Sequence, residues 1–219
     1  TTIKYVILIL KADNKGEGGI FSLFALVRKS KLKWLAFPAI IGGSALLADG
    51  LITPSISVSS AVEGLRYFNH DIPTIPIVIG ILFALFFIQQ FGTSFIGKFF
   101  GPLMFIWFLM LFILGINMLF TNVEILKAIN PYYAYNLLVN YEYGFVLLGA
   151  VFLCTTGAEA LYTDLGHCGR KNIRGSWIFV KICLLFNYFG QGAWLLNRTG
   201  DALDHHNPFY SIMPSWFLF

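Results

Sequence analysis

Charge is what this chain of 219 residues has least of. Only 12% of its residues are charged and 57% are hydrophobic, and phenylalanine alone contributes 23 residues. A soluble domain carries about a quarter charged residues, so this shortage excludes an ordinary water-soluble fold. The mean hydropathy of +0.72 agrees with that conclusion. The composition therefore predicts a membrane protein whose first partner is the lipid bilayer.

The chain also lacks the motifs of several function classes. Its three cysteines, Cys154, Cys168 and Cys183, do not have the C-x-x-C spacing of zinc or redox sites. Neither H-E-x-x-H nor G-x-S-x-G occurs, and Asp49 does not stand in the Gly-x-Gly-Asp setting of intramembrane aspartyl proteases. No repeated carbonyl-ring sequence of a channel filter is present, and the net charge of +4 is small and scattered. We therefore predict no enzyme, no cofactor and no nucleic-acid partner.

Long hydrophobic runs are what the chain has in abundance. A helix needs roughly 20 apolar residues to cross a bilayer, and five stretches qualify, approximately residues 34–65, 72–91, 101–120, 144–162 and 177–196. Residues 1–10 and 207–219 resemble parts of further spans, so we expect a piece of a longer protein. None of the stretches alternates with period two, which argues against a β-barrel. The sequence predicts an all-α, polytopic helix bundle that forms a single transmembrane domain over residues 1–219.

Basic residues predict the orientation of these spans. Eight of them lie in alternate loops and three in the others, and the side richer in Lys and Arg is normally cytoplasmic. The richer loops, expected in the cytoplasm, are residues 28–33, 92–100 and 166–175. The eight are Arg28, Lys29, Lys31, Lys33, Lys98, Arg170, Lys171 and Arg174, against Arg66, Lys127 and Arg198.

The first span contains a proline at membrane depth. Pro54 removes one helical hydrogen bond and crowds the preceding turn, so a kink or local unwinding is expected near residues 51–54. A break of this kind persists in a membrane only where protein or a water-filled cavity satisfies the freed carbonyl groups. The stretch is therefore expected to face the interior of the bundle.

Two groups of polar residues interrupt the apolar spans. Asp49, Thr53 and Ser57 follow one another at intervals of four, which places them on one face of a helix. Thr156 and Glu159, three apart in the fourth span, are expected to share a face as well. A charge at the bilayer centre costs several kcal/mol unless it is paired or hydrated.

The chemistry of these groups indicates a cation. Carboxylate, hydroxyl and carbonyl oxygens are hard ligands that suit alkali and alkaline-earth ions better than zinc or copper. The alternative is that the hydroxyls bond to their own helix and the acids pair with neighbouring side chains. We favour a metal-ion site made of Asp49, Thr53, Ser57, Thr156 and Glu159, in which the two groups face each other across the bundle.

Asp49, Thr53 and Ser57 belong to the longer stretch ADGLITPSISVSSAVEGL. Other distinctive stretches are ADNKGEGGIFSLFALV, QQFGTSFIGKFFGPLMFIWF, INPYYA, GAVFLCTTGAEALYTDLGHCGRKNIRGSW, NYFGQGAWLL and NPFYSIMPSW. Together and in order, these stretches resemble the Kup/HAK/KT family of potassium uptake permeases, in which the first usually begins Gly-Asp-Gly. The resemblance covers nearly the whole chain.

The resemblance implies a fold, an activity and a role for the five oxygen-bearing residues. The fold is the LeuT-like inverted repeat of the APC superfamily, which binds its substrate near the midplane at discontinuous helices. The activity is potassium uptake, coupled in many bacterial members to proton entry, in the inner (cytoplasmic) membrane. Asp49, Thr53, Ser57, Thr156 and Glu159 match positions that line the potassium site. One K⁺ neutralises one carboxylate, and the other is expected to take up a proton.

The chain also departs from the family pattern. The Gly-Asp-Ile-Gly-Thr-Ser-Pro-Leu-Tyr motif of the family's first helix, which supplies further ligands, is missing, as are the later helices. This piece is therefore expected to be inactive alone. An amino-acid or cation permease of the same fold stays the alternative. Gly97 and Gly101 form a G-x-x-x-G pattern, for which a homodimer contact and packing within the chain both remain open.

Overall fold

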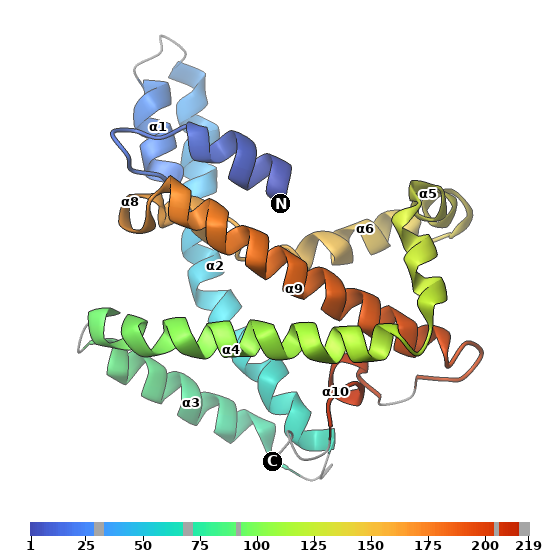
Figure 1. Cartoon of the computed structure of the whole chain (residues 1–219). Helices are drawn as coiled ribbons and strands as arrows, with labels where there is room; N and C mark the ends of the chain where they lie inside the picture. The colour runs from blue at the N-terminus through green and yellow to red at the C-terminus, as the bar shows by residue number, and fades with distance from the viewer. Residues whose placement is uncertain (29–32, 68–71, 91–92, 204–205, 215–219) are drawn as a thin grey trace. The chain divides into compact units, whose positions relative to one another are not determined.

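The computed structural model describes residues 1–28, 33–67, 72–90, 93–203 and 206–214, and across these ranges every regular element is helical (Figure 1). The basic residues at 29–32 and part of the expected loop 92–100 lie outside the described residues. In chain order the helices are η1 (Thr2–Leu8), η2 (Ile9–Lys11), α1 (Ile20–Arg28), η3 (Lys33–Leu35), α2 (Ala36–Glu63), η4 (Gly64–Tyr67), α3 (Thr74–Gln89), α4 (Thr93–Leu119), η5 (Val123–Ile129), α5 (Pro131–Asn140), α6 (Gly144–Leu153), α7 (Ala160–Thr163), α8 (Leu165–Cys168), α9 (Arg170–Leu196) and α10 (Pro208–Ser211).

Among the described residues, three helices are long and apolar enough to cross a membrane. They are Ala36–Arg66, Lys98–Leu119 and Arg170–Leu196, which correspond to the first, third and fifth expected spans. The second and fourth spans contain the shorter apolar helices Thr74–Ile88 and Gly144–Leu153. At 1.5 Å per residue a ten-residue helix is about 15 Å long, which is half of a hydrocarbon core of about 30 Å. Because α6 ends at Leu153, the expectation of one continuous helix over residues 144–162 is wrong.

The chain divides into two compact units. The first contains residues Thr1–Leu47 and Lys127–Val180, and the second contains Ala48–Leu126 and Lys181–Phe219. In the first unit, η1 and η2 pack beside the start of α9. Their shared core consists of the buried residues Val6, Leu10, Tyr162, Leu165 and Ile173. The N-terminal helix is fixed further where the indole N–H of Trp177 donates to the hydroxyl of Thr2 at 3.0 Å.

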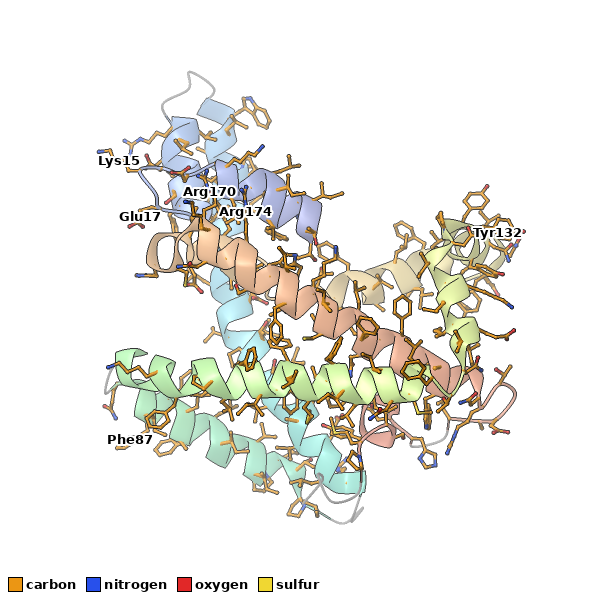
Figure 2. All side chains as sticks on the ribbon, viewed as in Figure 1. Lys15, Glu17, Phe87, Tyr132, Arg170 and Arg174 are labelled. Atoms are coloured by element: carbon orange, nitrogen blue, oxygen red, sulfur yellow. The ribbon has the colours of Figure 1, made fainter. Side chains whose placement is uncertain are left out.

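A tight turn connects this core to α1. Asn14 and Glu17 pair through both of their backbone hydrogen bonds, at 2.9 and 3.1 Å. Lys15 and Gly16 between them both have positive φ, of 57° and 89°, as a type I′ turn requires. Figure 2 shows Lys15 and Glu17 at the end of the unit where Arg170 begins α9. The short helix α1, Ile20–Arg28, follows this turn.

In the second unit, α4 and α9 cross at two glycines. A side-chain carbon on Gly115 would overlap the backbone carbonyl of Phe186, and one on Gly190 would lie 2.6 Å from the carbonyl oxygen of Gly115. Small residues allow helix backbones to approach this closely. Phe112 and Phe186 pack edge to face beside the crossing, with ring centroids 5.0 Å apart. The two helices are therefore held by backbone contact, which a methyl group would prevent.

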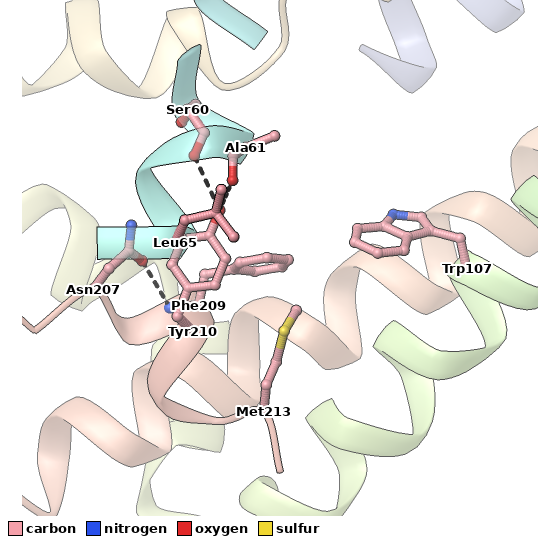
Figure 3. Close-up of a pocket in the computed structure, with 9 residues that line it drawn as sticks. Ser60, Ala61, Leu65, Trp107, Asn207, Phe209, Tyr210 and Met213 are labelled. Carbon is pink, nitrogen blue, oxygen red and sulfur yellow. Dashed lines mark hydrogen bonds between the residues drawn. The ribbon is translucent and has the colours of Figure 1, made fainter. Parts of the chain in front are cut away.

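The last described helix caps the end of α2 in the same unit. The Tyr210 hydroxyl lies 3.0 Å from the carbonyl oxygen of Ser60 and 3.3 Å from that of Ala61 (Figure 3). These carbonyls belong to the last turn of α2, just before the 3-10 helix η4 begins at Gly64. α10 itself begins with Asn207, whose side chain accepts from the backbone N–H of Phe209 at 2.9 Å. An open cavity of about 470 Å³ lies between these elements and Trp107 of α4.

The crossing of α4 and α9 gives a first prediction. Replacing Gly115 with alanine in the full-length protein should destabilise it by about 1–3 kcal/mol, the usual cost of overpacking, and lower its melting temperature in detergent. Gly101→Ala is the matched control, because Gly101 is in the same helix with open space around its Cβ position. Equal melting temperatures for the two variants would show that the crossing does not depend on the small residue.

Candidate cation site

The first group of oxygen-bearing residues lies in the middle of α2. Asp49 is 13 residues after Ala36 and 14 before Glu63, the two ends of the helix. The Thr53 hydroxyl donates to Oδ1 of Asp49 at 2.6 Å, and the pair is partly buried. Because a hydroxyl oxygen keeps its lone pairs while donating, Thr53 can still offer an oxygen to a cation. Asp49 and Thr53 thus lie on one face of the helix, as predicted, while Ser57, one turn further along, is exposed.

Of the kink or local unwinding expected near residues 51–54, the unwinding does not occur. The helix is α-helical throughout Ala36–Glu63, with Pro54 inside it. Pro54 has no N–H, so the carbonyl of Gly50 loses its usual donor four residues ahead. The Ser55 hydroxyl donates to the next carbonyl, that of Leu51, at 3.2 Å. The residue after Asp49 therefore has a carbonyl without its usual helical donor, although the helix is not unwound.

The fourth expected span is interrupted at the second group of oxygen-bearing residues. α6 ends at Leu153, and a series of turns covers residues 154–159 before α7 begins at Ala160. Gly157, at φ +90°, takes a left-handed conformation that side-chain-bearing residues rarely adopt. Thr156 and Glu159 are thus in a turn segment, and the expectation that they share a helix face is wrong.

This break leaves backbone oxygens available. Leu153 and Phe152 still accept, from the amides of Thr156 and Thr155, at 3.1 and 2.9 Å. Among the described residues, no hydrogen-bond donor reaches the carbonyl oxygens of Cys154 or Thr156. In hydrocarbon such groups need a partner from protein, water or ligand.

The side chain of Glu159 folds back on the same turn segment. Its Oε1 accepts from the backbone N–H of Gly157 at 3.0 Å, and its side chain is half-buried. The Thr156 side chain is exposed. Within the described residues neither Glu159 nor Asp49 forms an ion pair with a basic side chain. Each group therefore combines a carboxylate with hydroxyl and carbonyl oxygens on the same short segment of chain.

The two groups belong to different compact units, Asp49 to the second and Glu159 to the first. Their expected approach across the bundle stays a prediction. The sequence analysis did not identify the carbonyl oxygens of Gly50, Cys154 and Thr156. The Gly50 carbonyl could have been predicted, since a proline at position 54 removes the donor that this carbonyl normally has. For Cys154 and Thr156, the one indication in the sequence was the lone Gly157 in an apolar stretch.

Comparison with known proteins identifies the family. A family profile described as "K+ potassium transporter integral membrane domain" matches residues 1–219. A probable potassium transport system protein Kup from Cytophaga hutchinsonii is 67% identical over all of this chain and 34% of its own length. The corresponding protein of Flavobacterium psychrophilum is 64% identical over 99% of the chain and 34% of its own length. That of Clostridium perfringens is 57% identical over all of the chain and 35% of its own length.

The chain corresponds to only a part of each of these relatives. It spans about a third of the length of the curated relatives it matches. No solved structure matches it. The relatives are named as potassium transport proteins, which are transporters and not enzymes. With a full-length match to the family profile, the chain belongs to the family of potassium transporter integral membrane domains that includes the Kup proteins.

Proposed function

We propose that this chain is part of a potassium uptake transporter and supplies both halves of its ion site. The observation that carries the proposal is the break at residues 154–159. It leaves the carbonyl oxygens of Cys154 and Thr156 without a donor among the described residues, in the same short segment that carries Glu159. The similarity to proteins named as potassium transport system proteins supports potassium as the ion.

The depth of the two groups supports a site near the midplane. Tyr141 and Tyr143 precede α6 and are exposed, and tyrosines of this kind mark the membrane interface. The break begins ten residues later, about 15 Å deeper. Asp49 lies at the middle of α2. Both acids are thus expected where an unneutralised charge is most costly, and a bound cation removes that cost.

The proposed ligands are Asp49, Thr53 and Ser57 on α2, and Thr156 and Glu159 at the break. Their oxygens, with the freed carbonyls, are of the type that replaces the hydration shell of K⁺. One ion neutralises one carboxylate, and a second carboxylate in the same low-dielectric site is best neutralised by a proton. Uptake of K⁺ would then carry H⁺ with it, as a symport.

The architecture proposed for the whole protein follows from the same features. A discontinuous helix at substrate depth is characteristic of the LeuT-like inverted repeat, in which this chain would form part of one transmembrane domain. The protein would be in the inner membrane of a bacterium, with loops 28–33, 92–100 and 166–175 in the cytoplasm. This third of the protein would be inactive alone, and a homodimer stays an open expectation.

The first test of this function concerns Asp49. A full-length version should restore rubidium uptake, as a substitute for potassium, to cells that lack their own potassium uptake systems. Asp49→Asn keeps the hydrogen-bond partner of Thr53 but removes the charge, and should lower uptake more than about tenfold, since even indirect partners of metal ions contribute that much. Ser59→Ala, in the same helix, is the control. Normal uptake by Asp49→Asn at equal membrane levels would make Asp49 a structural residue, and amino-acid uptake in place of rubidium would refute the potassium assignment.

The second test concerns proton coupling at the break. Glu159→Gln keeps an oxygen that can accept from the N–H of Gly157 but cannot exchange a proton. In vesicles, this variant should lose uptake or carry rubidium without the accompanying proton, measured with an internal pH dye. Rubidium entry that acidifies the interior as strongly as in the unmodified protein would exclude Glu159 from the coupling.

A further inference from the structure

The loop of residues 12–19 is attached firmly to the start of α9. Oδ1 of Asp13 pairs with a guanidinium nitrogen of Arg170 at 2.5 Å, and Oδ2 accepts from the backbone N–H of Gly16 at 2.9 Å. One carboxylate thus links the tight turn to α9, which is 157 residues away in sequence. Figure 2 shows the labelled Glu17 and Arg170 gathered where the turn meets the helix.

The same loop holds the short helix that follows the break. The hydroxyl of Tyr162 donates to the carbonyl oxygen of Ala12 at 2.5 Å, and only 6% of Tyr162 is exposed. Gly18 lies so close that an added side-chain carbon would overlap the carbonyl oxygen of Tyr162. A side-chain carbon added to Gly19 would lie 3.6 Å from the Cα of Thr163, which is an ordinary contact. The loop and α7 therefore fit each other through backbone contacts as well as through the phenol.

Glu159 is the residue on which α7 begins. It is the N-cap of α7, and its carbonyl oxygen accepts from the N–H of Tyr162 at 2.9 Å and of Thr163 at 3.2 Å. On the other side of Glu159 lies Gly157, whose conformation is the least constrained of any residue type. The position of Glu159 is thus fixed mainly from the α7 side, through Tyr162 and the loop.

We propose that Tyr162, held by the loop of residues 12–19, is a positioning residue that keeps the Glu159 carboxylate in place for cation binding. The inference rests on the function proposed above and adds a control point that is remote from the ion. If the loop releases Tyr162, the first turn of α7 can shift, and Glu159 moves with it. A looser carboxylate binds the ion more weakly, while the ligand set stays chemically complete.

The experiment measures rubidium uptake by the full-length protein as a function of rubidium concentration. Tyr162→Phe removes only the hydroxyl and should raise the concentration for half-maximal uptake by roughly tenfold, the usual effect of losing an indirect partner of a metal ion, with a nearly unchanged maximal rate. Gly18→Ala displaces the same carbonyl from the loop side and should act in the same direction. The matched controls are Tyr135→Phe, at an exposed tyrosine, and Gly175→Ala, in open space on α9. Neither control should change the half-maximal concentration.

A second measurement reports binding without transport. Cys154 is an exposed free cysteine at the start of the break, so rubidium should slow its reaction with maleimide when the other cysteines are replaced. Tyr162→Phe should shift this protection to higher rubidium concentration by the same factor as in uptake. Unchanged half-maximal values in both assays, or the same shift in the controls, would overturn the positioning role. Because Glu159→Gln is tested separately, a failure here is distinguishable from a failure of the ion site itself.

Discussion

In a bilayer, a backbone carbonyl that leaves a helix must find another partner, and this requirement governs where the chain can be irregular. α2 meets it by remaining helical through Pro54, although the carbonyl of Gly50 loses its usual donor. The segment of residues 154–159 meets it in part. The Thr155 hydroxyl bonds back to Phe152 at 2.8 Å and Glu159 accepts from Gly157, but the carbonyls of Cys154 and Thr156 find no donor among the described residues. In the function proposed above, a bound cation would be the partner of these two carbonyls.

The carboxylates of Asp49 and Glu159 support the same conclusion, because no basic side chain is paired with them in the described part of the chain. A structural role for Asp49 or Glu159 would call for a fixed basic partner, because a lone buried charge is costly. Neither has one within the described part of the chain. In contrast, Asp13 at the end of the first unit is paired with Arg170. The chain thus pairs the carboxylate that joins the turn to α9, and under the proposed function Asp49 and Glu159 would be neutralised by a mobile cation and a proton instead.

The sequence predicted the long elements well and the break poorly, for physical reasons. The apolar runs fix α2, α4 and α9, and the boundaries of α1 follow from the turn before it. The break was expected at Pro54 because proline is the strongest helix breaker, yet one lost bond is tolerated inside a long helix. Gly157 was the true breaker, and a lone glycine in an apolar run can equally mark close packing. The contact of Tyr162 with Ala12 joins residues 150 apart, and no local pattern encodes it.

Asp49 and Glu159 belong to different compact units, and neither group alone offers enough oxygens to replace a hydration shell. The group on α2 has a carboxylate, hydroxyls and the Gly50 carbonyl, and the group at the break has a carboxylate, a hydroxyl and two carbonyls without donors. The proposed site would need both groups. Selectivity for an ion of one size depends on how such groups are held relative to it. Control of the break by the loop of residues 12–19 would therefore act on affinity directly, because it sets the geometry of one half without altering its chemistry.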